Sequence, residues 1–369
     1  MRAVAVLGVL IIHVGAASGA NLLAWYGVAT SQGRLGVRIF FVISAFLLYR
    51  PYVMAHLHGE SAPKPGVYAK RRALRIVPAY WVALLLLSIW PGLPEVWTGQ
   101  WWIYFGMLQA YFYSTIHLGL AVAWSLTIEV AFYVMLPFLA MFLGWLGRDV
   151  SPRSRMRRQI WALASLGLAS EILRLVLFSL DRRDLNFTLP SMFLPFAVGM
   201  GLAVSSAWLG RDESRWGWTR FVVSHSGACW GGAAALFVAC CFTPIFSRAG
   251  AADHTVLTWG LEQFVYVVIA ALLLLPAVFG ENAGGWPRRI LANRWVAFVG
   301  AASYGVFLWH HPILAWMAEA GWGGAIPGFP VLSLFIPCLL VSVLLGWISH
   351  RCIELPAMRL RGEPPKRLS

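Results

Sequence analysis

The sequence predicts an all-α polytopic membrane protein with about ten transmembrane helices, one short re-entrant or interfacial helix, and both termini in the cytoplasm. Of the 369 residues, 59% are hydrophobic and 12% are charged, whereas soluble domains carry about 25% charged residues. Mean hydropathy is +0.69. The apolar runs long enough to cross a bilayer are 3–20, 36–55, 76–93, 124–147, 160–180, 187–209, 225–246, 256–279, 295–319 and 329–349.

One further apolar run, 99–113, is short, and short runs more often re-enter or lie along the membrane than cross it. The basic residues support this reading, because Lys and Arg concentrate in cytoplasmic loops. With ten spans and an inside N-terminus, 23 of the 29 Lys and Arg residues fall inside and five outside. If 99–113 crossed the membrane, every later loop would change sides and the asymmetry would collapse.

The net charge of +14 does not point to a nucleic-acid partner. No zinc-finger spacing, RNP motif or basic heptad region is present, and the basic residues lie in short gaps between apolar runs. The charge is better explained by membrane topology, and part of it can hold an anionic substrate. The five cysteines form no CxxC pair, so neither zinc binding nor redox chemistry is indicated.

The first span carries two ionisable residues, Arg2 and His13, in an otherwise apolar run. Eleven residues make about three helical turns, so both side chains point to nearly the same side, roughly 16 Å apart. If Arg2 marks the membrane edge, His13 lies near the midplane, where an ionisable group faces a protein interior or a wet cavity. A cleaved signal peptide ending near 18–20 is the competing interpretation.

Arg72 and Arg75 belong to the densest basic cluster at a membrane face, 70–75. Three residues apart, they are neighbours on a helix, and arginine suits phosphate because its fork binds bidentately. The alternative is a topology anchor that binds lipid headgroups.

Several other ionisable residues lie within apolar runs. Glu129 needs a partner there: it can orient a histidine, bind a sugar hydroxyl or pair with an arginine. His310 lies deep in a late span, where a buried histidine is more often simply hydrogen-bonded than catalytic. Glu171 and Arg174 are three apart and are expected to neutralise each other, whereas Glu262 has no evident role.

Taken together, these residues fall into motifs that resemble the acyltransferase-3 family, the membrane-bound O-acyltransferases of bacterial surface carbohydrates and some natural products. The sequence departs from the family pattern at Ala45, where the family usually has glycine. In chain order, the motifs are Arg2 and His13 with ten residues between them, Phe40-Phe41-Val42-Ile43-Ser44-Ala45, Arg72-Ala73-Leu74-Arg75 followed by Ile76-Val77-Pro78, Trp124-Ser125-Leu126-Thr127-Ile128-Glu129, Ser303-Tyr304 through Leu308-Trp309-His310, and Glu354-Leu355-Pro356.

The resemblance implies one transmembrane acyltransferase domain at 1–356 and a basic cytoplasmic tail at 357–369, in the inner or plasma membrane. The donor would be an acyl-CoA, most often acetyl-CoA, that arrives from the cytoplasm as a substrate; no permanently bound cofactor is expected. Arg2, Arg72 and Arg75 would bind this donor. The acceptor would be a hydroxyl of a carbohydrate, glycolipid or natural product.

The resemblance also implies that His13 is the central catalytic residue, either as general base or as a transient acyl carrier. Glu129 would orient His13 or bind the acceptor, and its predicted depth in the outer half favours the acceptor. His310 would assist from the opposite wall. Two other classes remain open: a secondary transporter or flippase with His13 and Glu129 on a proton or substrate path, and a non-catalytic sensor or scaffold.

Overall fold

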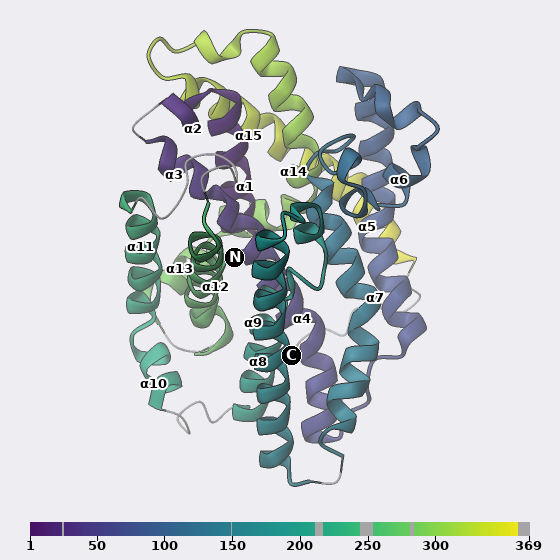
Figure 1. The fold of residues 1–369 in the computed structure, drawn as a ribbon, viewed down its shortest axis with the longest axis vertical. Helices are drawn as coiled ribbons and strands as arrows, with labels where there is room; N and C mark the ends of the chain where they lie inside the picture. The colour runs from purple at the N-terminus through teal and green to yellow at the C-terminus, as the bar shows by residue number, and fades with distance from the viewer. Residues whose placement is uncertain (24–25, 149, 211–216, 244–253, 281–283, 361–369) are drawn as a thin grey trace.

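The computed structural model describes residues 1–23, 26–148, 150–210, 217–243, 254–280 and 284–360, and within these ranges it contains helices and no strand. Each apolar run predicted to cross the membrane holds one principal helix (Figure 1). These helices are α1 (Arg2–Ala17), α4 (Leu35–His58), α5 (Pro65–Leu87), α7 (Ala123–Trp145), α8 (Pro152–Ser179), α9 (Phe193–Leu209), α11 (Ser226–Phe242), α12 (Val256–Val278), α14 (Arg294–Glu319) and α15 (Pro330–Ser349).

The all-helical, multi-pass membrane architecture is confirmed. Six helices among the described residues are long and apolar enough to cross a membrane, or up to eight if each of two bent pairs is one span. α1 and α9 are apolar but shorter, so the count of ten and the cytoplasmic termini stay predictions. Residues 99–113 hold only α6 (Trp101–Phe105) and two single turns, in agreement with the prediction that they do not cross.

Three helices begin more than one residue away from the start of the predicted run. α5 begins at Pro65 rather than at 76, because the basic segment consists of good helix formers and proline is favoured at a first helical position. α8 begins at Pro152 rather than at 160, after Ser151, whose side chain accepts a hydrogen bond from the Ser154 amide. α9 begins at Phe193 rather than at 187, because residues 188–192 form turns.

α1 lies inside the bundle and packs on α4, α14 and α15. Its N-terminus lies about half-way along the long axis of the molecule (Figure 1). The expectation that Arg2 marks the membrane edge stays a prediction, and the structure adds that neighbouring helices extend well past Arg2. The sequence determines the distance between Arg2 and His13 along α1. It does not determine how far the 24-residue α4 extends past the end of the 16-residue α1, because that depends on packing.

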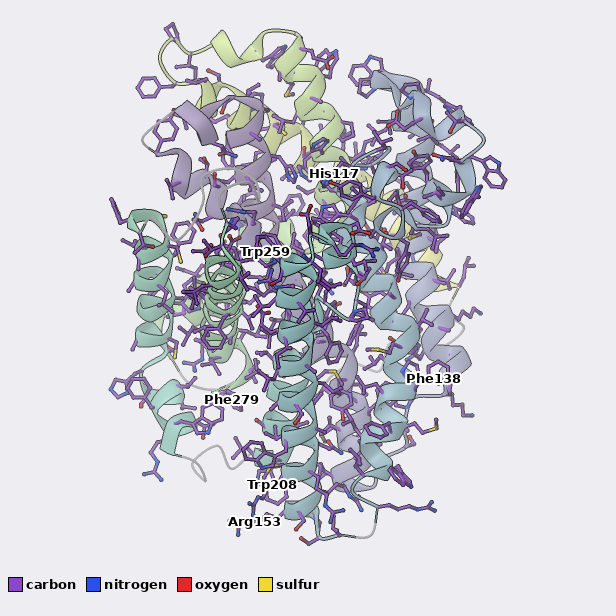
Figure 2. All side chains as sticks on the ribbon, viewed as in Figure 1. His117, Phe138, Arg153, Trp208, Trp259 and Phe279 are labelled. Carbon is purple, nitrogen blue, oxygen red and sulfur yellow. The ribbon has the colours of Figure 1, made fainter. Side chains whose placement is uncertain are left out.

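The connection between α7 and α8 and the first turns of α8 carry five arginines, at 148, 153, 155, 157 and 158. Arg153 lies at the end where α7 and α8 are joined, and His117 lies toward the opposite end (Figure 2). We call the first the basic end. The remaining short helices are α2 (Ala20–Leu23), α3 (Gly27–Ser31), α10 (Gly217–Ser224), α13 (Trp286–Ala292) and α16 (Leu355–Arg359). α16 crosses the predicted boundary between 356 and 357, and residues 361–369 of the predicted tail lie outside the described residues.

The residue that departs from the family motif, Ala45, forms a close helix contact. Ala45 is fully buried on α4, and a Cβ built at Gly199 of α9 would lie 2.8 Å from the Ala45 Cβ and closer still to the Val42 carbonyl oxygen. Small residues at such contacts let membrane helices approach closely.

This contact gives a stability prediction. Gly199→Ala should lower the free energy of unfolding by about 1–3 kcal/mol, because the added methyl overpacks the α4–α9 contact. Gly201→Ala on the same helix should cost nothing, since a Cβ there has no atom within 4 Å. Thermal unfolding in detergent measures both; equal melting temperatures for the two variants would contradict the prediction.

Candidate active site

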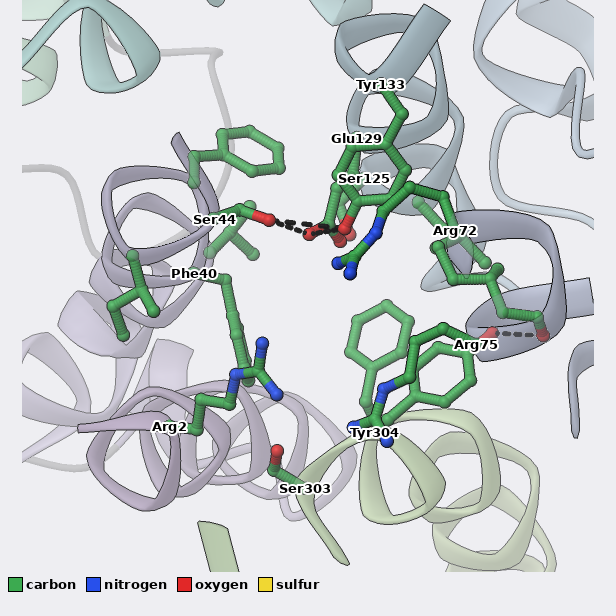
Figure 3. A pocket seen from close by; sticks show the side chains of 16 residues that line it. Arg2, Phe40, Ser44, Arg72, Arg75, Ser125, Glu129, Tyr133, Ser303 and Tyr304 are labelled. Atoms are coloured by element: carbon green, nitrogen blue, oxygen red, sulfur yellow. Dashed lines mark hydrogen bonds between the residues drawn. The ribbon is translucent and has the colours of Figure 1, made fainter. Parts of the chain in front are cut away.

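Helices α1, α4, α5, α7 and α14 converge on a cavity deep in the bundle (Figure 3). We call it the arginine cavity because three arginines contribute to its wall. Its lining consists of Arg2, Val37, Phe40, Phe41, Ile43, Ser44, Arg72, Arg75, Ile76, Ser125, Leu126, Glu129, Tyr133, Ser303, Tyr304 and Phe307. The three arginines predicted to bind the donor therefore lie together, although they come from two helices whose motifs are 70 residues apart in the chain.

Glu129 and two hydroxyls form the polar centre of this cavity. The Oε1 atom of Glu129 accepts hydrogen bonds from the Ser44 and Tyr133 hydroxyls, each at 2.5 Å. The guanidinium groups of Arg2 and Arg72 point into the same space (Figure 3). The Nε atom of Arg72 is buried and has no hydrogen-bond partner among the described residues, so Arg72 has a donor left for a ligand.

Arg75 is held differently. Its Nη1 lies 2.9 Å from Oε2 of Glu354, a fully buried carboxylate, and His350 Nδ1 lies 3.1 Å from the same oxygen. The pair joins α5 to the π-helical turn His350–Glu354 that follows α15. Arg75 thus has a carboxylate partner of its own, whereas Arg2 and Arg72 share the cavity with one carboxylate, Glu129, and leave an excess of positive charge.

A larger hollow of about 430 Å³ adjoins the arginine cavity. The two share Arg2, Ser44, Arg72 and Arg75, and the hollow extends to His350 and Met358. Together they form a cation-lined space whose wall includes Phe307 on one side and His350 and Met358 on the other. An anionic group with a slender tail fits this lining, because arginine donors can meet the charge while the tail lies against Phe307.

His13 and His310 are in direct contact. His13 Nδ1 lies 3.1 Å from His310 Nε2, and His310 is completely buried. The ring of His311 lies edge-on to His13, with centroids 5.0 Å apart. Residues from the first and the penultimate long helices therefore form one imidazole cluster. This contact is a condition for the predicted role of His310, which is to assist His13.

The hydrogen bonds fix the tautomers of this pair. His310 Nδ1 lies 2.9 and 3.0 Å from the carbonyl oxygens of Phe307 and Val306; because a carbonyl only accepts, that nitrogen carries the proton, and Nε2 of the neutral ring accepts. His13 Nδ1 faces two acceptors, His310 Nε2 and the Val9 oxygen at 2.7 Å, so it also carries a proton. The printed contacts of His13 with the described residues all use Nδ1, so the Nε2 lone pair of the neutral ring can take a proton from a reacting group.

His13 lines a second cavity of about 390 Å³, which we call the aromatic cavity. Its size falls within the range of about 300–1,000 Å³ that is usual for small-molecule sites. Its lining is Val9, Ile12, His13, Gly33, Arg34, Val37, Arg38, His117, Val122, Trp124, Ser125, Asn186, Phe187, Met192, Trp259, Glu262 and Phe307. Burial lowers the pKa of His117, which lies in the segment before α7, so its imidazole is neutral near pH 7.

Val37, Ser125 and Phe307 line both cavities and form the partition between them. His13 lies on the aromatic side. Glu129 lies on the arginine side, where it bonds Ser44 and Tyr133. The structure does not place Glu129 beside His13, because the turn of α7 that carries Glu129 faces the N-terminus of α1. The predicted role of Glu129 toward the acceptor stays a prediction.

Two further sequence expectations concern buried charges. Glu171 and Arg174 do pair, at 3.1 Å, as their spacing predicts. Glu262, which had no evident role in the sequence, lies 3.3 Å from both Arg34 Nη1 and His254 Nε2. It is the counter-charge of the aromatic cavity.

Sequence reasoning missed several residues of these cavities. Ser44 lies in a recognised motif, and Tyr133 lies four residues after Glu129 on the same helix face. Both could therefore have been predicted from the sequence. Asn186 and Trp259 were not. They come from a turn before α9 and from α12, carry no local signal, and reach the aromatic cavity only through tertiary packing.

Comparisons with known proteins agree with the motifs. The family described as "Acyltransferase domain", acyltransferase-3, matches residues 1–351. The O-acetyltransferase OatA of Staphylococcus aureus is 27% identical over 98% of this chain and 57% of its own length. The peptidoglycan O-acetyltransferase OatA of Listeria monocytogenes is 22% identical over 96% of this chain and 54% of its own. No solved structure matches.

The chain spans just over half the length of these curated relatives. The match to the family, by contrast, begins at residue 1 and includes every motif up to the turn after α15. It covers both cavities and the imidazole cluster between them. The chain therefore belongs to the acyltransferase-3 family.

Proposed function

We propose that this protein is a membrane O-acyltransferase that moves an acetyl group from acetyl-CoA to a hydroxyl of a cell-envelope glycan such as peptidoglycan. The observation that carries the proposal is the position of His13 beside the partition between a cation-lined cavity and an aromatic one. The relatives named O-acetyltransferases, one of them a peptidoglycan O-acetyltransferase, support the choice of group and acceptor.

The donor occupies the arginine cavity and the hollow beside it. Arg2 and Arg72 bind the phosphates of the coenzyme, because their guanidinium groups face the space and Arg72 retains a free buried donor. The pantetheine arm runs toward Phe307, which brings the thioester to the partition. With the basic end in the cytoplasm, the donor enters from that side.

His13 acts as general base in this mechanism. Its free Nε2 takes the proton of the acceptor hydroxyl while the hydroxyl oxygen attacks the thioester carbonyl carbon. The carbon–sulfur bond then breaks, and the protonated His13 returns the proton to the leaving thiolate. His310 holds His13 in the tautomer that leaves Nε2 free, and acts as a positioning residue.

The test uses the purified protein in liposomes with acetyl-labelled acetyl-CoA and an N-acetylglucosamine tetrasaccharide as acceptor. We expect free thiol and acetylated sugar to appear together, in amounts that agree. Uptake of label into the vesicles without thioester loss would favour a transporter and overturn the proposal. The absence of both would favour a scaffold and overturn it as well.

A further inference from the structure

The amide of Asn186 is buried without a partner. The residue is 1% exposed, and neither Oδ1 nor Nδ2 has a hydrogen-bond partner among the described residues. Burying unpaired polar atoms is costly. Because Asn186 lines the aromatic cavity, a ligand in that cavity can satisfy both atoms.

A second unpartnered donor and several rings lie around the same cavity. The indole Nε1 of Trp259 is also buried without a partner among the described residues. Trp124 and Phe187 lie edge to face, with centroids 5.1 Å apart. An apolar, aromatic wall with a few convergent polar groups is the usual composition of a site for a small organic ligand, and aromatic faces pack well on the C–H faces of a sugar ring.

The charged side chains of the cavity have partners within the protein. Arg34 pairs with Glu262, and Arg38 donates to the Gln263 amide oxygen at 2.9 Å. The groups left for a ligand are therefore neutral: an amide that offers one acceptor and two donors, an indole N–H, and ring faces. These match hydroxyl or acetamido groups better than a charged ligand.

We infer that Asn186 and Trp259 form an acceptor subsite for a neutral saccharide ring, and that Asn186 reads a hydroxyl or acetamido group of that ring. The inference rests on the proposed function for placing the acceptor in this cavity. It adds the residues that recognise the sugar and its chemical class.

Because the Asn186 amide is unpartnered among the described residues, substituting it should affect sugar binding and protein stability differently. Removing one partner of a hydrogen bond usually destabilises a protein, but Asn186 has no partner to lose in the described part of the chain. Replacing an unsatisfied buried polar group with an apolar one is neutral or stabilising. Asn186→Ala should thus weaken sugar binding without lowering the melting temperature.

The experiment measures binding of the N-acetylglucosamine tetrasaccharide to the full chain in nanodiscs by saturation-transfer NMR, without acyl-CoA. We expect Asn186→Ala to raise the dissociation constant about 10-fold, with an unchanged or higher melting temperature. An unchanged dissociation constant, a lowered melting temperature, or no binding by the wild type would each overturn the inference. Sugar binding without acetyl transfer would instead refute only the proposed function.

Asn21→Ala is the matched control. Asn21 is also a buried asparagine, but its Oδ1 accepts from the Thr30 hydroxyl at 2.5 Å and its Nδ2 donates to the Ile12 oxygen. It does not line the aromatic cavity. This variant should lower the melting temperature and leave the dissociation constant for the tetrasaccharide unchanged, the reverse of the pattern expected for Asn186→Ala.

Discussion

His13→Ala is expected to lower kcat for acetyl transfer by about 10²–10⁴-fold, the usual contribution of a general base. The KM for acetyl-CoA should change little, because His13 lies outside the arginine cavity that we propose as the donor site. Thiol release by the purified variant measures both constants. His225→Ala, which removes an exposed histidine that lines neither cavity, should behave as wild type.

Variants of His310 separate positioning from catalysis. Gln at this position can still accept the Nδ1–H of His13 through its amide oxygen, whereas Ala cannot. His310→Gln should therefore keep more activity than His310→Ala, and both should exceed His13→Ala. Full activity of His13→Ala would exclude the general base role, and equal activity of the two His310 variants would exclude the positioning role.

Arg72→Gln is expected to raise the KM for acetyl-CoA about 10- to 100-fold, because hydrogen bonds to charged groups contribute about 1.5–3 kcal/mol. The kcat should fall far less, since the proposed role of Arg72 is to bind the phosphates of the donor and not the reacting atoms. S-acetylpantetheine lacks the phosphates of the coenzyme, so its KM should be the same for the variant and the wild type. This second substrate distinguishes phosphate binding from general damage to the cavity.

The neighbouring Lys70 provides the control for Arg72. Lys70 is exposed on the same helix and does not line the cavity, so Lys70→Gln removes an equal charge without touching the donor. A KM increase as large for Lys70→Gln would show that the cluster acts only through its net charge. An unchanged KM for Arg72→Gln would show that the arginine is a topology anchor.

Much of the fold could be predicted from the sequence because membrane helices carry their signal locally. An apolar run of about twenty residues predicts a helix regardless of its neighbours, and the runs predicted for α12, α14 and α15 agree with their helices to within a residue. The pair at Glu171 and Arg174 is local too, since residues three apart on a helix are neighbours.

The arrangement of the site was harder to predict because it depends on how far helices slide past one another. The sequence places Glu129 six residues into its helix, but the relative heights of α1 and α7 decide that it meets Arg2 rather than His13. The partner of Arg75 shows the same limit. Glu354 was recognised as part of a motif, yet its contact with Arg75 spans nearly the whole chain and has no local signature.

The partition formed by Val37, Ser125 and Phe307 has an electrical consequence. A membrane potential does work on any charge that crosses it, about 2.3 kcal/mol per elementary charge for each 100 mV. None of the three partition side chains is ionisable, and an acetyl group is neutral, whereas the coenzyme is polyanionic. In the proposed mechanism, transfer across this wall moves the acetyl group without moving net charge, so the rate of acetyl transfer at saturating acetyl-CoA should not depend on the membrane voltage.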